Sequence, residues 1–230
     1  MPTDSLFDLA EVDRLLTTTK AVRRRLDLER PVERTVVLEC INLALYAPNA
    51  SNAQDWYWVV VDDPELRARV AEVYRDCVAP RSAAMLRTKL ADGDEAGARI
   101  SRSVLWLAES MADVPVLVLP CYDVAGAAKR YDHLLGDGAR EPVMEPAMYA
   151  SILPSVWSFQ LALRSRGLGS TLTTAHQFEQ AAVADILGIP RSWFQVALLP
   201  VAYTVGSDFT PSPRGPVEDV VVWNREWSPR

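Results

Sequence analysis

A ten-residue stretch, residues 47–56, constrains the fold of this chain most, because it must interrupt regular secondary structure. It reads Ala-Pro-Asn-Ala-Ser-Asn-Ala-Gln-Asp-Trp and separates an apolar run with helical spacing, residues 36–46, from a strand-like apolar run, residues 58–61. Proline lacks a backbone N–H, and asparagine and serine side chains compete for backbone hydrogen bonds, so neither element can continue through the stretch. The sequence therefore predicts a loop held by an element on each side.

This loop concentrates neutral hydrogen-bonding groups. Asn49, Ser51, Asn52 and Gln54 place several donors and acceptors beside one another. Such a set suits the recognition of a flat, polar-edged ring better than chemical attack on it. Two interpretations stay open on these ten residues alone: a loop that binds a cofactor ring, and an ordinary surface loop built from turn-forming residues.

The composition is typical of a soluble globular protein and leaves small acidic or aromatic ligands open. The chain has 230 residues, 49% hydrophobic and 23% charged, which predicts a single well-buried domain over residues 1–230. The net charge of −6 argues against a nucleic-acid partner, whose phosphates require a basic surface. No apolar run is long enough to cross a membrane, and the acidic N-terminus has no signal-peptide pattern. The three cysteines have no metal-binding spacing and fit a reducing cytoplasm.

A basic cluster follows a polar threonine run near the N-terminus. If residues 12–27 form a helix, Lys20 lies on one face with Arg23 and Arg24, three and four residues further on. Their charges then converge on one anion, and a phosphate is the natural ligand. A solvated charge run is the alternative interpretation.

Hydrophobic periodicity predicts both helices and strands along the chain. The helices are expected at residues 31–46, 64–77, 100–111, 148–166 and 178–187, and the strands at residues 56–61, 114–122, 167–174 and 194–204.

Prolines and turn residues mark the less regular parts. Pro115 and Pro120 predict that the second strand lies at an edge or is limited by its ends, and Pro200 is expected to interrupt the last strand. Residues 78–94 are expected to form a variable or mobile segment, and residues 123–146 a surface excursion.

Several conspicuous side chains have a structural rather than a functional interpretation. His133 and His176 are the only histidines, and neither has a carboxylate at ligand spacing, so no metal site or Ser-His relay is expected. Trp56, Trp157 and Trp193 are expected in the core rather than against a substrate.

Five segments occur in a recognisable order. They are the basic cluster, the loop at residues 47–56, Gly-Leu-Gly-Ser-Thr-Leu-Thr-Thr at residues 167–174, Leu-Leu-Pro-Val-Ala-Tyr at residues 198–203, and Pro-Arg-Gly-Pro at residues 213–216. Together they resemble the FMN-dependent nitroreductase family, which includes nitroreductases, flavin reductases and dehalogenases. The resemblance implies an α+β, three-layer fold with a central, mostly antiparallel sheet flanked by helices. It also implies an intertwined homodimer with FMN at the interface, in which a C-terminal extension from residue 205 packs on the partner subunit.

The same resemblance implies which residues bind the cofactor. Lys20 and Arg23 match positions that hold the FMN phosphate and the pyrimidine edge of the flavin, with Arg24 as a further cation. Thr173 and Thr174 match the strand end that approaches flavin N5. Arg214, near the C-terminus, matches a basic residue that reaches the phosphate. The other matches are loop residues that line the isoalloxazine ring or ribityl chain, usually from the other subunit: Pro48, Asn49, Ser51, Asn52 and Gln54.

The activity that the resemblance implies is hydride transfer from NADH or NADPH, through flavin N5, to an electron-poor small molecule such as a nitroaromatic or a quinone. Three positions depart from the family pattern. Residues 19–21 read Thr-Lys-Ala in place of Arg-Arg-Ser, residues 54–56 read Gln-Asp-Trp in place of Gln-Pro-Trp, and residues 174–175 read Thr-Ala in place of Glu-Gly.

The Thr173–Thr174 pair is more similar to the dehalogenase branch of the family, and two alternatives stay open. One is a specialised flavoprotein, namely a dehalogenase, a flavin-fragmenting enzyme or a biosynthetic dehydrogenase, with residues 78–100 as a selective lid. The other is a non-enzymatic protein that stores FMN or senses a ligand.

Overall fold

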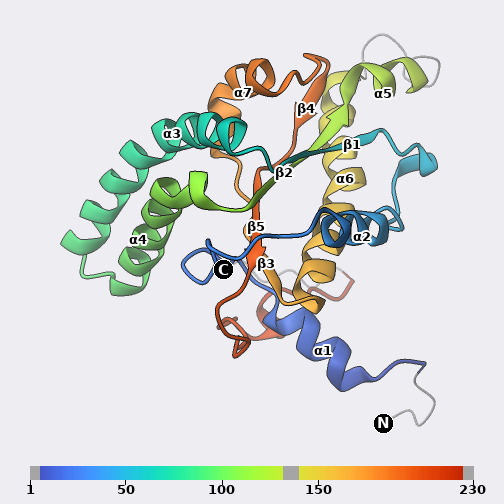
Figure 1. The fold of residues 1–230 in the computed structure, drawn as a ribbon. Coiled ribbons are helices and arrows are strands. Elements are labelled where there is room, and N and C mark those ends of the chain that lie inside the picture. The colour runs from blue at the N-terminus through green and yellow to red at the C-terminus, as the bar shows by residue number, and fades with distance from the viewer. Residues whose placement is uncertain (1–5, 132–139, 225–230) are drawn as a thin grey trace.

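A five-stranded sheet forms the centre of the fold, and the computed structural model, shown in Figure 1, describes residues 6–131 and 140–224. The sheet has the order β1 (Trp56–Val61), β2 (Val116–Asp123), β5 (Leu199–Tyr203) and β3 (Leu168–Ser170), and β4 (Trp193–Gln195) also pairs with β2. All of these pairings are antiparallel, as the resemblance implied.

Helices cover both faces of the sheet, which confirms the expected three-layer α+β fold. One face carries α3 (Pro64–Ala91), α4 (Glu95–Ser110) and α7 (Gln180–Leu187), and the other carries α2 (Arg34–Ala44) and α6 (Arg140–Ser165). Strand β2 contributes Leu117 and Leu119 to the first core and Val116 and Val118 to the second, because alternate residues of a strand point to opposite faces. Burial on both faces explains why β2 is apolar throughout rather than alternating.

Local signals begin and end several helices where the sequence predicts. Asp63 caps α3 by accepting a hydrogen bond from the Leu66 backbone N–H at 2.9 Å, and Pro64 occupies the first helical position. Gly188 ends α7 in the left-handed conformation, with φ of 67°.

Pro115 lies directly before the first residue of β2, as the prediction of a strand end requires, but Pro120 lies inside this strand, which has neighbours on both sides, so the prediction was wrong for Pro120. The Pro120 carbonyl accepts a hydrogen bond from the Val196 backbone N–H at 2.9 Å. The nitrogen and carbonyl of one strand residue point to the same side, so the Pro120 nitrogen faces the interval between β4 and β5. No ladder bond from that nitrogen is needed there, which makes a proline acceptable in a central strand.

The last predicted strand, residues 194–204, is two strands. The break falls at residues 196–198, and Pro200 lies inside β5, in register with Leu117 of β2. The expected interruption at Pro200 was therefore wrong.

The segment at residues 78–94 is helical rather than irregular. Helix α3 continues through Pro80 to Ala91, and the chain turns at Gly93 into α4. Figure 1 shows the two helices side by side, forming a hairpin that projects from the sheet. The prediction failed because the outer part of this hairpin is polar on most sides and gives no clear helical periodicity.

Two other expectations change. The N-terminal helix, α1 (Leu9–Thr18), ends before Lys20, so the basic cluster is not helical. Residues 123–146 contain α5 (Val124–Tyr131) and the start of α6, and residues 132–139, including His133, lie outside the described residues. No helix of the described ranges is long and apolar enough to span a membrane. The remaining elements are short 3-10 turns at Ala50–Asn52, Met111–Asp113, Ala175–Glu179 and Val217–Asp219.

Candidate functional site

The basic segment, residues 19–27, lies against β3 and β5. The Val22 backbone N–H donates to the Ser170 carbonyl at 2.9 Å, and the Asp27 N–H donates to the Tyr203 carbonyl at 2.8 Å. Val22 and Leu26 are buried between these attachments. The cations of the segment therefore project from a backbone that is fixed to the sheet.

Gly169 of β3 allows this close approach. A Cβ atom at this position would lie 2.7 Å from Thr204 Cγ2 and 3.0 Å from Val22 Cβ, which is too close for either neighbour to keep its place. The glycine is required by space rather than by an unusual φ angle.

We expect Gly169→Ala to reduce the free energy of unfolding by about 2 kcal/mol, because an extra methyl group in a filled core forces its neighbours apart. Urea denaturation measures this loss, and Gly215→Ala, at an exposed glycine whose Cβ would have only one neighbour at 3.8 Å, is the control. Equal stability of the two variants would contradict the assigned role of Gly169.

A pocket of about 450 Å³ opens over the basic segment. Within the described part of the chain its lining has a single carboxylate, Asp208, against five cations. This excess of positive charge attracts an anion. The lining residues are Lys20, Ala21, Val22, Arg23, Arg24 and Arg25 of the segment, Arg99 and Ser103 of α4, and Asp208, Phe209 and Thr210 of the C-terminal segment.

Arg23 is half-buried in this pocket, and its guanidinium donates to no group in residues 6–131 or 140–224. Burial lowers the pKa of Arg23, and the neighbouring Tyr74 opposes that shift. An arginine remains charged at neutral pH in spite of such a shift. A charged group that is partly withdrawn from water, with all of its donors free, is suited to hold an anion.

Two other cations of the segment hold the C-terminal segment in place. Lys20 Nζ donates to the Thr210 carbonyl at 2.8 Å. Arg25 pairs with Asp208, donates to the Val205 carbonyl at 2.9 Å, and stacks over the Phe209 ring at 4.1 Å. Arg24 is exposed at the pocket. Lys20 therefore has a structural contact in addition to the ligand contact that the sequence predicts.

Tyr74 of α3 connects the basic pocket to the predicted flavin N5 segment. The Thr173 Oγ1 hydroxyl donates to Tyr74 Oη at 3.1 Å, and Tyr74 is only 2% exposed. Thr173 is itself held by mutual backbone hydrogen bonds with Leu198, at 3.1 and 2.8 Å. Burial raises the pKa of Tyr74, and the Thr173 hydrogen bond and the Arg23 charge oppose this shift. Sequence reasoning missed Tyr74, although a tyrosine on the apolar face of a predicted helix is a detectable signal.

The loop at residues 47–56 adopts strained backbone conformations. Ser51, Asn52 and Gln54 have φ angles of 53°, 49° and 54°, a region that non-glycine residues seldom occupy. The loop is held by Asn49, whose Oδ1 accepts from the Gln54 N–H at 3.0 Å, and by Ser151 of α6, whose Oγ accepts from the Ala50 N–H at 3.3 Å. Strain of this kind is often kept at ligand sites.

Within this loop the predicted binding residues divide into two groups. Asn49 is half-buried and its side chain shapes the loop, while Pro48, Ser51, Asn52 and Gln54 are exposed. At the end of the loop Asp55 pairs with Arg130 of α5 at 2.7 Å, with its side chain only 7% exposed. The aspartate that replaces the family's proline therefore attaches the loop to α5.

One chain does not bring all the predicted residues together. The loop packs against α6, whereas the basic segment packs against β3 and β5, and no loop residue of the described chain lines the basic pocket. Arg214 is exposed, donates to the neighbouring Pro213 carbonyl at 2.8 Å, and lies outside that lining. Thr173 and Thr174 line an adjacent pocket together with Tyr74.

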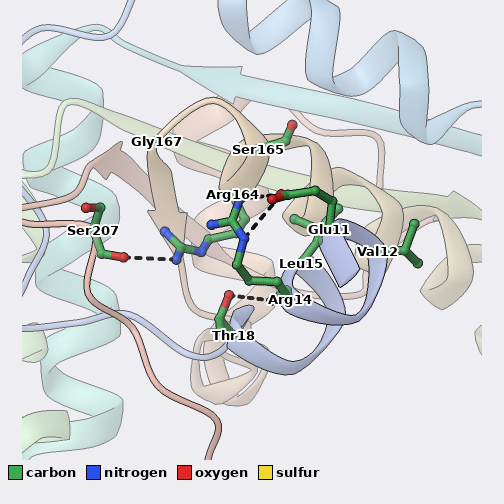
Figure 2. A pocket seen from close by; sticks show the side chains of 9 residues that line it. All are labelled: Glu11, Val12, Arg14, Leu15, Thr18, Arg164, Ser165, Gly167 and Ser207. Atoms are coloured by element: carbon green, nitrogen blue, oxygen red, sulfur yellow. Dashed lines mark hydrogen bonds and ion pairs between the residues drawn. The ribbon is translucent and has the colours of Figure 1, made fainter. Parts of the chain in front are cut away.

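Figure 2 shows a different pocket, of about 440 Å³, between α1, the end of α6 and the C-terminal segment. There Arg14 is paired with Glu11, and Arg164 donates to the Ser207 carbonyl at 3.4 Å. None of the predicted cofactor residues lines this pocket in the part of the chain that the structure describes. The candidate site is therefore the basic pocket with the adjoining Tyr74 and Thr173.

The fold and this pocket define an α+β domain with a cationic site beside its sheet. The chain belongs to the nitroreductase family, whose family model matches residues 17–203. In the described ranges, no group of three or more His, Cys, Asp or Glu side chains is arranged so that it could hold a metal ion.

Solved structures share the fold at low sequence identity. A BluB-like flavoprotein from Clostridium difficile 630 is 19% identical, with a TM-score of 0.65, and the match covers 95% of this chain and 100% of that chain. An iodotyrosine deiodinase bound to FMN and 3-iodo-L-tyrosine is 21% identical, with a TM-score of 0.66 and coverages of 94% and 100%. A nitroreductase-like protein from Streptococcus mutans is 15% identical, with a TM-score of 0.68 and coverages of 95% and 100%.

Proposed function

We propose that the protein is an FMN-dependent oxidoreductase that takes hydride from NADH or NADPH and passes it to an electron-poor small molecule, such as a nitroaromatic or a quinone. The observation that carries the proposal is the half-buried Arg23 guanidinium with its donors free, next to Tyr74. Tyr74 in turn contacts Thr173. The FMN that accompanies the deiodinase structure of the same fold supports the choice of cofactor.

The donor set fits FMN. Lys20, Arg23 and Arg24 would hold the anionic phosphate and the pyrimidine edge of the ring, and Thr173 and Thr174 would lie against the ring near N5. When bound, FMN supplies reversible hydride chemistry at its N5 atom. Pro48, Asn49, Ser51, Asn52 and Gln54 would line the ring or ribityl chain of the partner's cofactor, and Arg214 would reach the phosphate.

The residues of this chain act by charge and by hydrogen bonding. The half-buried Arg23 guanidinium stabilises negative charge beside it more strongly than it would in bulk solvent. Thr173 donates to Tyr74, so the Tyr74 O–H remains free to donate in turn. Its raised pKa keeps that proton in place at neutral pH. The pair therefore offers one hydrogen-bond donor, the Tyr74 hydroxyl, beside Thr173.

We propose further that the functional unit is a homodimer. Helices α2 and α6 contact each other and leave large apolar side chains exposed, among them Leu38 and Leu43 of α2 and Leu153 and Trp157 of α6. Trp157 was expected in the core, yet it is 41% exposed. Apolar side chains grouped on one layer favour association with a second copy. Such a dimer would carry the exposed loop residues to the basic pocket of the partner subunit.

We place this homodimer in the cytoplasm. Cys40, Cys77 and Cys121 are buried and free. Burial raises the pKa of Cys40 to about 11 and that of Cys121 to about 12, so both thiols stay protonated and unreactive at neutral pH. Free thiols of this kind fit a reducing compartment.

The function is tested by loading the purified protein with FMN and mixing it with each nicotinamide in a stopped-flow spectrometer. We expect one or both of NADH and NADPH to bleach the flavin absorbance, and a quinone such as menadione to restore it. A colourless protein that takes up no FMN would reject the proposal. A yellow protein that neither nicotinamide bleaches would instead support storage or sensing.

A further inference from the structure

A pocket of about 330 Å³ lies beside Thr173 and Thr174, between α3, α4 and the chain that follows β3. Its walls are mostly apolar, with Val78 and Val104 on the helical hairpin and Leu172 on the opposite side. This volume is near the lower limit for small-molecule sites, which matches a ligand with a single ring.

Arg81 of α3 is the one cation of this lining within the described residues. Its Nη1 donates to the Cys77 carbonyl at 2.7 Å, and its guanidinium lies 4.1 Å from the centre of the Phe178 ring. These two contacts fix the guanidinium in place before any ligand arrives, so little side-chain freedom is lost on binding.

The remaining donors of Arg81 have no acceptor in residues 6–131 or 140–224. A guanidinium has five N–H donors, and the Cys77 carbonyl uses only the one nitrogen. Besides burial, the charges of the nearby carboxylates, Glu179 and Asp76, both raise the pKa of the Cys77 thiol, so they lie in this region. Neither carboxylate pairs with Arg81 or lines the pocket. Asp76 lies instead 3.9 Å from Arg75.

On the basis of the proposed function, we infer that the electron acceptor is a small aromatic carboxylate whose ring occupies this apolar pocket and whose carboxylate binds Arg81. A mostly apolar, open pocket with one exposed cation at its side favours a ligand that is apolar at one end and singly negative at the other. The pocket adjoins Thr173 and Thr174, where the proposed flavin ring would lie. Arg81 therefore determines specificity and does not take part in hydride transfer.

The test compares two nitroaromatic ligands that differ in charge, 4-nitrobenzoate and the neutral 4-nitrobenzamide. Isothermal titration calorimetry measures their binding to the oxidised, FMN-loaded protein without any nicotinamide. We expect the benzoate to bind up to about fivefold more tightly than the amide, because Arg81 is exposed and solvent screens part of the interaction. Arg81→Leu should remove this preference and leave the affinity for the amide unchanged.

Arg87→Leu is the matched control, because Arg87 is exposed on α3 as Arg81 is, but it does not line the pocket. This variant should keep the preference for the benzoate. In turnover, Arg81→Leu should raise the KM for the benzoate by up to about fivefold and leave kcat unchanged. Equal binding of the two ligands by the original protein, or a preference that survives Arg81→Leu, would overturn the inference.

The calorimetric result is independent of flavin reduction. A protein that prefers the benzoate through Arg81, but whose flavin neither nicotinamide bleaches, would uphold the binding site and reject the proposed reaction. A protein whose flavin is bleached and reoxidised, but which binds both ligands equally, would uphold the proposed reaction and reject the binding site.

Discussion

Arg23→Ala should weaken FMN binding about 100-fold, the equivalent of about 2.7 kcal/mol. The expected loss is large because Arg23 is half-buried, stays charged, and has no hydrogen-bond partner in the described chain that could compete with the cofactor. Quenching of FMN fluorescence on titration with the protein measures the dissociation constant. The stability of the FMN-free protein should barely change, since the substitution removes no hydrogen bond.

Arg24→Ala is the control for this prediction. Arg24 lines the same pocket but is exposed, so its charge is screened by solvent, and we expect the affinity for FMN to fall by less than about fivefold. The comparison separates a specific guanidinium contact from a general effect of net charge. Equal losses in the two variants would show that the pocket attracts FMN only by its overall charge, and an unchanged affinity in Arg23→Ala would remove Arg23 from the site.

Between pH 6.5 and pH 4 the protein should lose about 3 kcal/mol of stability through His176 alone. His176 is fully buried, and within the described ranges neither ring nitrogen has a hydrogen-bond partner. Burial lowers its pKa to about 4 from the ordinary value of 6.5. The unfolded chain therefore binds a proton in this interval that the folded chain does not, and stability falls as the pH falls through it. Well above pH 6.5 both states are neutral at His176, and the effect is absent.

Urea unfolding at several pH values, with His176→Leu as the comparison, isolates this contribution. The leucine variant keeps a similar volume and has no titrating ring, so its stability should depend less steeply on pH between 6.5 and 4. His133, the only other histidine, is present in both proteins and cancels in the difference. Parallel pH profiles would contradict the prediction. So would an NMR titration of the original protein that gives His176 a pKa near 6.5.

Regular elements with a clear period could be predicted from the sequence. Strand β1 was placed at its observed bounds, and the helices at residues 31–46 and 148–166 correspond to α2 and α6. The central place of β2 in the sheet could not be predicted in this way. Whether a central strand tolerates Pro120 depends on which neighbouring strand the proline nitrogen faces. The prediction for the outer part of α3 was wrong for a related reason. Its helical state comes from pairing with α4 rather than from an apolar stripe of its own.

The candidate site was predictable only through the order of motifs. Neither Arg23 nor the loop identified a ligand by itself, since a charge run and a surface loop explain each of them equally well. The structure adds Tyr74, which looks like an ordinary core residue in the sequence because its hydroxyl partner, Thr173, lies 99 positions away. Arg81 and Arg99 could not be distinguished from other helical arginines without knowing what they face.

The two ends of α3 differ in how freely they can change during evolution. Residues such as Val70 and Tyr74 are enclosed by the core, whereas no residue of α3 after Val78 is buried. Substitutions near the tip of the hairpin can therefore accumulate without weakening the domain, and those close to Arg81 would reshape the entrance to the adjacent pocket. New ligand preferences can arise in this way while the cofactor end of the same helix stays as it is.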